Sequence, residues 1–177
     1  MTKIQHSFLY TLMGYILLFA PQGLSMKPAP FTKITFTDPH TDMKVISNPN
    51  TNHTQVLDAK GKEIWSMDIF IGRRKVFLSN DGKFLILMGN HYFGNRIKID
   101  PKAYVLEYYS MGKKEKQWTF IQAFGLTIQE AVTKYQVPVL GGGWIYMDKF
   151  ISIDRIDWST KKIYLTYKDN QQGSISF

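Results

Sequence analysis

The 177-residue chain contains no cysteine. This absence excludes a small domain held together by disulfides, and it excludes thiol catalysis and thiolate metal sites. The two common phosphate-binding glycine loops, G-x-x-x-x-G-K-[ST] and G-x-G-x-x-G, are also missing, so we expect no nucleotide cofactor and no other cofactor. No apolar run reaches the length of about 20 residues that a membrane-spanning helix needs.

Signatures of familiar hydrolases are absent as well. No serine lies in a G-x-S-x-G elbow between a strand and a helix, which an esterase requires, and the glycines at 141–143 are typical of a turn. No pair of histidines has the H-x-H or H-E-x-x-H spacing of a metal site. Asp154 and Asp157 are three residues apart, which in a strand places them on opposite faces and makes them poor partners for glycoside hydrolysis.

The composition indicates a folded domain. Hydrophobic residues make up 44% of the chain and aromatic residues 15%, which excludes a disordered protein. The 13 glycines and 7 prolines follow no period, which excludes a collagen-like chain. The length predicts one globular domain.

The N-terminus, residues 1–25, is predicted to be a secretory signal peptide. Lys3 supplies a positive charge, and an uncharged, mostly apolar run follows at residues 7–20. The small residues Gly23 and Ser25 fit a cut after Ser25. The alternative is an uncleaved membrane anchor. Export without cysteine favours the bacterial periplasm or the outside of the cell, since small exported eukaryotic domains often carry disulfides.

The rest of the chain has the pattern of a β-protein. We expect residues 26–30 to be a flexible lead-in and residues 31–177 to be a single β-rich domain, because short runs of Val, Ile, Tyr, Phe and Trp alternate there with turn residues. Glycine beside Asp, Asn or Met supplies the positive φ of tight turns. Four strand–turn–strand units are predicted, at residues 56–65, 76–87, 106–120 and 151–165.

Two further elements stand out. Residues 84–88 are continuously apolar and short, which favours a central strand covered on both faces. Thr127 and Glu130 have the spacing of a capping box, and Pro138 ends the periodic pattern, so a helix is predicted over 127–136. The predicted fold is therefore all-β, an antiparallel meander of propeller-like hairpins with one short inserted helix, forming a partial propeller or a sandwich.

Residues 78–85, LSNDGKFL, resemble the S-x-D-G-K-x-L turn of PD40/WD40-like propeller blades. The wider stretch 56–125 is similar to a group of uncharacterised exported bacterial proteins, through its G-x-x-x-W-S, S-x-D-G and Y-x-x-x-G-K elements at 61–66, 79–82 and 109–113. The resemblance implies a stack of β-hairpins and carries over no catalytic residue.

One cluster has the residue types of a metal site. Asp38, His40 and Asp42 lie at alternate positions, so an extended loop can aim them to one side, where they could hold a divalent metal. His91 is a further candidate for such a site. The other interpretation, which we favour, is a polar turn in which Pro39 fixes φ and Asp38 bonds its own backbone.

Basic charge is the most distinctive property of the surface. The chain carries 22 Lys and Arg against 14 Asp and Glu, and many of the basic residues fall in predicted turns. If these turns share an edge, they form a basic rim that can meet anionic lipid, acidic polysaccharide or nucleic acid. The candidate rim residues are Arg73, Arg74, Lys75, Lys113, Lys114 and Lys116, with Lys161 and Lys162 in a further turn.

Aromatic residues are numerous enough to line a face near this rim: Trp65, Tyr92, Phe93, Tyr108, Tyr109 and Trp118. In strands, however, aromatic side chains usually pack in the core or across strands, and charges in turns usually serve solvation and edge protection.

The sequence therefore predicts an exported, non-enzymatic binding or scaffolding domain that acts through a sheet face or edge and the basic rim. Its expected partner is a protein or an anionic surface ligand. No nucleic acid is expected, and membrane contact is expected only through an uncleaved N-terminus or the rim. The alternative is a small exported hydrolase or metal-dependent enzyme with a site near Asp38 and His40.

Overall fold

The computed structural model describes residues 31–89, 96–98, 100, 102–136, 139, 144–149 and 151–177. The predicted signal peptide and lead-in, His91, Tyr92, Phe93 and the glycines at 141–143 lie outside these residues. Phe31–Phe177 forms one compact unit. Among the described residues, no helix is both long enough and apolar enough to cross a membrane.

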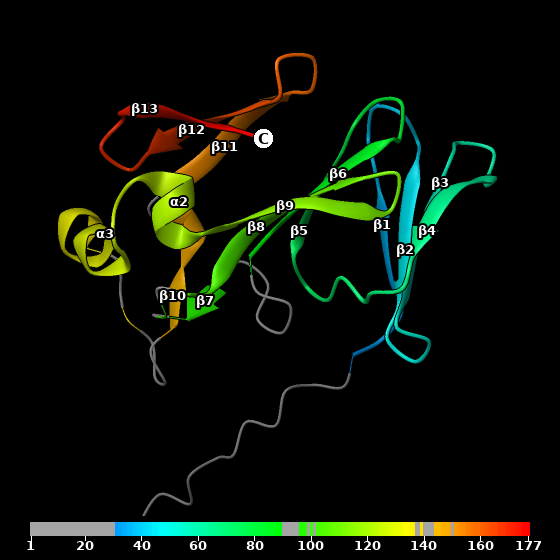
Figure 1. Cartoon of the computed structure of the whole chain (residues 1–177), viewed down its shortest axis with the longest axis horizontal. Coiled ribbons are helices and arrows are strands. Elements are labelled where there is room, and N and C mark those ends of the chain that lie inside the picture. Colours follow the sequence, from blue (N-terminus) through cyan, green and yellow to red (C-terminus); the bar gives the residue numbers. More distant parts are fainter. Residues whose placement is uncertain are drawn as a thin grey trace, which may run out of the picture. The chain divides into compact units, whose positions relative to one another are not determined.

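The first sheet is a four-stranded antiparallel meander in the order β1-β2-β3-β4. It carries the first predicted hairpin, in which Val56 pairs with Trp65. In β2, buried and partly exposed residues alternate, as expected for a strand with one face on a core. The strands are β1 (Ile34–Thr37), β2 (Lys44–Asn48), β3 (His53–Leu57) and β4 (Glu63–Met67) (Figure 1).

The second sheet is also antiparallel and four-stranded, in the order β5-β6-β8-β9, so that β5 and β9 are its edges. It contains the second and third predicted hairpins. The continuously apolar segment 84–88 is β6, a central strand, as predicted. The strands are β5 (Lys75–Leu78), β6 (Phe84–Met88), β8 (Tyr104–Ser110) and β9 (Lys113–Thr119).

A third sheet, antiparallel and in the order β11-β12-β13, contains the fourth predicted hairpin. A two-stranded pair, β7 with β10, completes the described strands. The elements are β7 (Arg96–Lys98), β10 (Trp144–Tyr146), the short 3-10 helix η1 (Met147–Lys149), β11 (Ile151–Asp157), β12 (Lys162–Tyr167) and β13 (Gln172–Ser176). The all-β antiparallel prediction is confirmed, while the propeller-like arrangement stays a prediction.

The described residues contain two short α-helices where one helix was predicted. α3 (Ile128–Tyr135) has the predicted capping box, because the Glu130 N–H donates to the Thr127 hydroxyl and the Thr127 N–H donates to the Glu130 carboxylate. α2 (Phe120–Phe124) was not predicted, because its aromatic and β-branched residues read as an extension of the preceding strand. Gly125 ends it at φ 69°.

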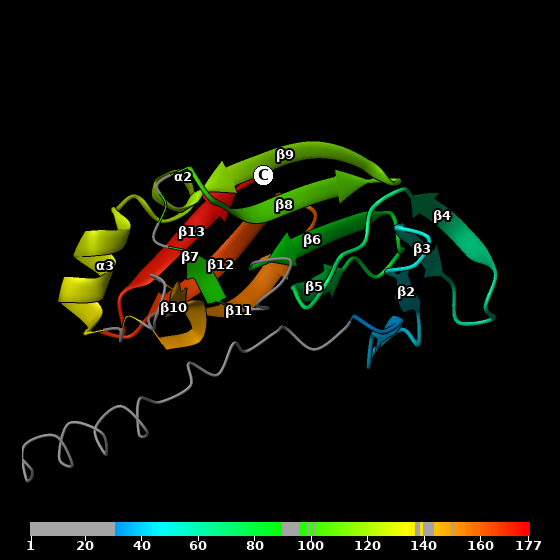
Figure 2. The ribbon, with the colours of Figure 1, turned by 90° about the horizontal axis from the view of Figure 1, so that it is seen from below.

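The second sheet has a hydrophobic core on each face. In Figure 2 it runs between the strands of the first sheet and those of the third. Along β6, Leu85 and Leu87 belong to the core shared with the first sheet. Ile86 and Met88 belong to the core shared with the third sheet and the helices. Residues along a strand point alternately to its two faces, so β6 must be apolar throughout, which explains its continuous hydrophobic run.

The first and second sheets are joined at their turns. The Trp65 Nε1–H of β4 donates to the Gly82 carbonyl oxygen in the β5–β6 turn, at 2.7 Å. Gly112, in the β8–β9 turn, has φ +81°, and a Cβ there would collide with the Ser66 carbonyl oxygen. Glycine is needed at this position both for its backbone angle and for the close approach.

Candidate functional site

Basic residues from an edge strand and from a hairpin turn come together at one cleft, since Lys113, Lys114 and Lys116, which were expected in a turn, belong to β9. The cleft, of about 300 Å³, lies where the second sheet meets the end of the third. Lys116 reaches it from β9, and Lys161 reaches it from the β11–β12 turn. We call this site the basic cleft, and its lining residues are Phe84, Tyr108, Ser110, Glu115, Lys116, Lys161 and Phe177.

A β-bulge in the edge strand β9 shapes one wall of the basic cleft. Tyr108 pairs with Lys116, whereas the next residue, Tyr109, pairs with Lys114, so Glu115 is an extra residue in the ladder. A bulge redirects side chains that would otherwise alternate between the two faces. As a result, the neighbours Glu115 and Lys116 both line the cleft.

The two ammonium groups of the cleft are exposed. Lys116 Nζ lies 4.9 Å from the ring centroid of Trp118 and donates a long hydrogen bond, 3.4 Å, to the Ser176 carbonyl oxygen. Within the described residues, neither Lys116 nor Lys161 forms an ion pair. Both positive charges therefore remain available to a ligand.

Glu115 brings a carboxylate to the same cleft. It forms a 3.3 Å ion pair with Lys113, which is itself largely exposed. Burial raises the pKa of the Tyr108 hydroxyl, and the negative charge of Glu115 adds to the rise. The cleft thus offers hydrogen-bond acceptors as well as cations.

Aromatic rings form the apolar part of the lining. Phe84 stacks against Tyr108, with ring centroids 6.0 Å apart, and against Trp158, at 6.2 Å. Phe177 packs on Tyr108 at 4.8 Å and on Trp158 at 5.7 Å. These four rings come from both sheets and hold the cleft walls in place.

The other predicted rim residues lie elsewhere. Lys75 is on β5, the opposite edge of the second sheet from β9, so three strand spacings, roughly 14 Å, separate the two edges. The register also aligns Lys75 with Trp118, at the far end of β9 from Lys113. Arg73 is exposed near Phe31, with its guanidinium carbon 5.8 Å from the ring centroid. The six residues do not form one continuous rim.

Arg74 lies in a buried network instead of on the surface. Its guanidinium pairs with the Glu107 carboxylate of β8 at 2.5 Å, and the two side chains are 9% and 16% exposed. The Tyr109 hydroxyl donates to the same carboxylate at 2.8 Å, and Lys114 Nζ lies 3.6 Å from its other oxygen. Arg74, Glu107, Tyr109 and Lys114 are called the Glu107 network below.

The pKa shifts in this network follow from its charges. Burial opposes ionisation of Glu107, but the guanidinium of Arg74 and the hydroxyl of Tyr109 outweigh it and hold the pKa below the ordinary value. Burial and the neighbouring Glu107 carboxylate raise the pKa of Tyr109. The network is thus an anion site filled by the protein's own glutamate, with one carboxylate between two cations.

Asp38 caps the turn between β1 and β2. Its Oδ1 accepts from the His40 N–H at 2.9 Å and from the N–H and the hydroxyl of Thr41, each at 3.0 Å. The Asp42 N–H donates to the Asp38 carbonyl oxygen, and Asp42 has φ 57°. This is the geometry of a polar turn. Among the described residues, no group of three His, Asp or Glu side chains could hold a metal ion.

The aromatic residues noted in the sequence are mostly core residues. Trp65, Tyr108, Tyr109 and Trp118 are each no more than 6% exposed. Only Tyr108 among them reaches the basic cleft. Packing, and not an exposed aromatic face, is therefore the main use of these side chains.

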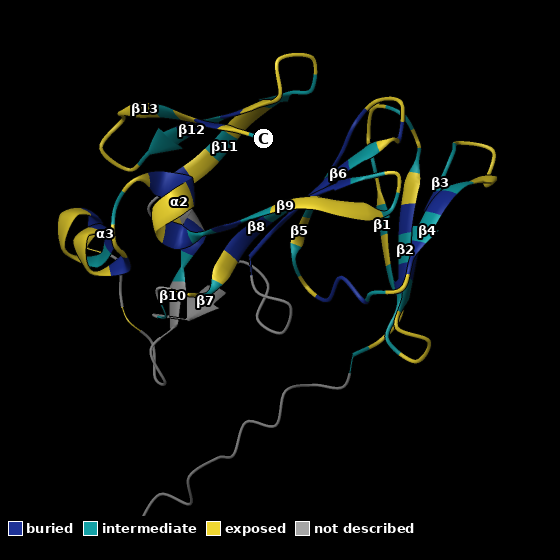
Figure 3. Cartoon of the chain, in the orientation of Figure 1, coloured by how far each residue is buried: buried dark blue, intermediate teal, exposed yellow. Residues whose placement is uncertain are grey.

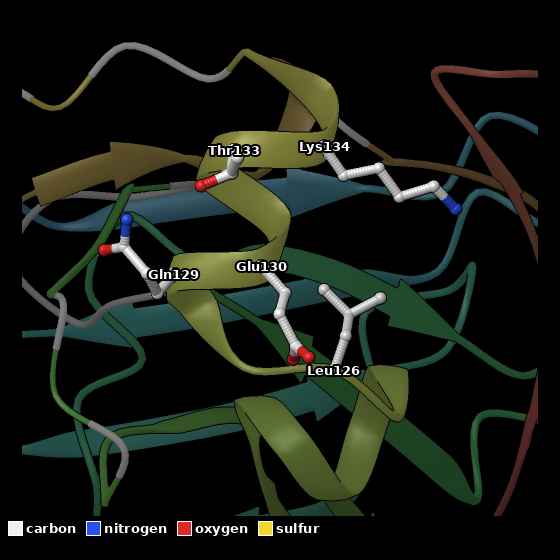
Figure 4. Close-up of a pocket in the computed structure, with 5 residues that line it drawn as sticks. All are labelled: Leu126, Gln129, Glu130, Thr133 and Lys134. Carbon is white, nitrogen blue, oxygen red and sulfur yellow. The ribbon is translucent and has the colours of Figure 1, made fainter.

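A larger hollow, of about 550 Å³, lies along α3, where Leu126, Gln129, Glu130, Thr133 and Lys134 line it (Figure 4). Gln129 and Thr133 extend to one side of the helix and Lys134 to the other. The Glu130 carboxylate is engaged by Thr127, and Lys134 pairs with Asp169 at 3.0 Å. Its polar groups do not converge, and its two charged groups are already engaged, so this hollow is the weaker candidate.

Sequence reasoning identified Lys116, Lys161 and the aromatic Tyr108, but it missed the other lining residues of the cleft. Phe84, Ser110 and Glu115 carry no functional motif, and their positions depend on a bulge and on contacts between two sheets. Basic charge was the available signal, since a lysine of β9 and a lysine of the β11–β12 turn meet here. Comparison with known protein families, with characterised proteins and with solved structures finds no match to this chain.

Proposed function

We propose that this chain is a non-enzymatic binding domain of the cell exterior or periplasm that holds an acidic polymer at the basic cleft. The observation that carries the proposal is the meeting of Lys116 and Lys161, from two different sheets, in one cleft with no ion-pair partner in the described part of the chain. Two unneutralised cations in a concave site raise the local concentration of anions.

A polymer chain suits the site better than a membrane surface. The cations line a cleft with an aromatic lining, which a narrow strand can enter and a flat bilayer cannot. The alternative of strand addition at β9 is less favoured, because this edge carries lysines and a bulge, which are features that protect edges from pairing. Export rests on the N-terminal sequence pattern.

Enzymatic activity is the second candidate and has less support. A metal-dependent site near Asp38 and His40 would need a free carboxylate, and the Asp38 Oδ1 already accepts three hydrogen bonds from its own turn. Glu115 is the one acidic side chain among the described residues that line the basic cleft. Paired carboxylates for acid–base chemistry are not brought together there.

Binding of the purified full-length protein to polygalacturonate and to polyglutamate tests the proposal. We expect both polymers to bind at low salt, and binding to weaken as ionic strength screens the charges. The double variant Lys116→Met with Lys161→Asn removes both cations and should weaken binding about tenfold or more. Asn is chosen at 161 because it tolerates the left-handed backbone there, φ 53°.

The matched control removes two charges from the opposite edge, as Arg73→Gln with Lys75→Gln. It has the same net charge as the cleft variant and should bind both polymers within about twofold of the wild type. Equal losses of affinity in the two variants would mean that net charge alone drives binding, and they would refute the basic cleft as the binding site. Preferential binding to vesicles of anionic lipid would refute the choice of a polymer.

A further inference from the structure

The aromatic lining gives the basic cleft a chemistry beyond charge. Phe84 and Phe177 are only partly buried, and together with Tyr108 they present ring surface to the cleft. A site that recognised charge alone would gain nothing from this apolar surface, because solvated anions do not pack on aromatic carbon. The ligand is therefore expected to have an apolar surface of its own.

The polar groups of the cleft place a second requirement on the ligand. Ser110 offers a hydroxyl and Glu115 a carboxylate, and both line the same cleft as the two ammonium groups. Glu115 would repel a ligand that carried only negative charge, whereas it accepts hydrogen bonds from hydroxyl groups. The site thus suits a ligand with hydroxyl donors, at least one anionic group and a flat apolar face.

A six-membered sugar ring with a carboxylate meets all of these requirements. Its axial C–H groups form an apolar face that can lie on an aromatic ring, and its hydroxyls project around the rim. Its carboxylate can pair with an ammonium group. The cleft volume of about 300 Å³ is at the lower end for small-molecule sites, which favours one sugar unit over a longer buried segment.

We infer that the basic cleft binds a uronate unit of an acidic polysaccharide, with the ring on Phe84 and Phe177, the carboxylate at Lys116 and Lys161, and the hydroxyls at Glu115 and Ser110. This inference rests on the proposed function and narrows its ligand. It predicts a preference for the sugar ring over an equally charged polymer without one.

The test compares two probes of matched charge on the full-length protein. Oligogalacturonate carries carboxylates on sugar rings, and polyglutamate of equal charge carries them on a peptide chain. We expect oligogalacturonate to bind about fivefold tighter than polyglutamate. Neutral oligogalactose, which has the ring without the carboxylate, should bind more weakly than either.

Phe84→Leu isolates the contribution of the ring. It keeps an apolar side chain but removes the aromatic surface, so oligogalacturonate binding should fall about fivefold while polyglutamate binding stays unchanged. Unchanged polyglutamate binding also shows that the variant is folded. Phe77→Leu, a ring loss on β5 outside the cleft lining, is the matched control and should alter neither affinity.

The outcomes separate the two proposals. If both polymers bind equally and Phe84→Leu has no effect, the sugar inference fails while the polyanion site stands. If neither polymer binds, the proposed function fails as well. If Phe84→Leu and Phe77→Leu weaken the binding of both polymers to the same extent, the substitutions act on folding. The wild-type protein then decides, because equal affinity for the two polymers would refute the sugar inference.

Discussion

Arg74 and Lys161 were both predicted to contribute positive charge to the surface, and the structure places them in opposite environments. The Arg74 side chain is 9% exposed and paired with Glu107. Lys161 is exposed, lines the basic cleft and has no ion pair within the described residues. Figure 3 shows the same contrast along the second sheet, where β9 is largely exposed and neighbouring β8 is mostly buried.

The comparison shows that the position of the acidic side chains decides whether a basic residue joins a structural ion pair or stays available to a ligand. Glu107 stands on β8 and pairs with both Arg74 and Lys114. At the cleft, the one acidic side chain among the described lining residues, Glu115, pairs with Lys113, which lies outside that lining. The Glu107 network is therefore expected to act in stability and the basic cleft in binding.

The largest effect is expected from Arg74→Met. Removal of the guanidinium leaves the partly buried Glu107 with the neutral Tyr109 hydroxyl and with Lys114 as its only cation in the network, so the free energy of unfolding should fall by about 3 kcal/mol. Urea denaturation of the purified protein measures this change. Arg73→Met, at an exposed position, is the control, with an expected change within about 0.5 kcal/mol. Equal losses in the two variants would remove the distinction between buried and exposed arginine.

A smaller loss is expected from Gly112→Ala in the turn that begins β9. The added Cβ would collide with the Ser66 carbonyl oxygen, and the backbone has a positive φ, so we expect a loss of about 2–3 kcal/mol. Gly61→Ala is the matched control, because φ there is +83° but the space around it is open. Its loss should be about 1 kcal/mol, from the backbone alone. Thermal or urea unfolding that gave equal losses would show that the sheets do not pack closely at this turn.

Glu107 is expected to make the free energy of unfolding depend on pH. Its pKa is lower in the folded protein than in the unfolded chain, where it is about 4.5. The unfolded state therefore binds the proton first as pH falls. The stabilisation is fully present above pH 4.5 and is lost as pH falls through the folded pKa.

Unfolding free energies measured between pH 6 and pH 3 should fall less steeply for Glu107→Gln than for the wild type. Glu63→Gln, which removes an exposed carboxylate from β4, serves as the control and should keep the wild-type slope. An unchanged slope in Glu107→Gln would contradict the assignment of acid sensitivity to the Glu107 network.

The smallest effect on stability is expected from Lys161→Asn in the basic cleft. Lys161 has φ 53°, a left-handed angle that Asn adopts more readily than Lys. Lys161→Asn should therefore keep the wild-type stability or raise it by about 0.5 kcal/mol. A clear loss on urea unfolding would mean that this lysine supports the fold and is not held available for a ligand.

Local patterns carried most of the fold prediction. The four hairpins, the central strand β6 and the capped helix α3 follow from residues close in sequence. Helix α2 was missed because Phe120–Phe124 has strand-like residues, although Thr119 and Gln122 have the spacing of a capping box and Gly125 ends the helix. The grouping of hairpins into three main sheets depends on contacts between distant residues, which no local pattern encodes.

The candidate site was only half predictable for the same reason. Lys116 and Lys161 were visible as basic residues near predicted turns, although Lys116 belongs to β9, and their meeting depends on how two sheets pack. The ion pair between Arg74 and Glu107 spans 33 residues of sequence, so it could not be predicted from the residues next to Arg74. Asp38 was the opposite case, since its partners lie within three residues and the polar turn was foreseen.

Parallel measurement of stability and polygalacturonate binding in Arg74→Met and Lys161→Asn tests the central claim most directly. The account predicts that Arg74→Met loses stability but binds normally under conditions where it is folded. It predicts that Lys161→Asn keeps its stability and binds polygalacturonate more weakly than the wild type. Normal binding by Lys161→Asn, or a loss of binding by folded Arg74→Met, would contradict the separation of a structural charge network from a binding cleft.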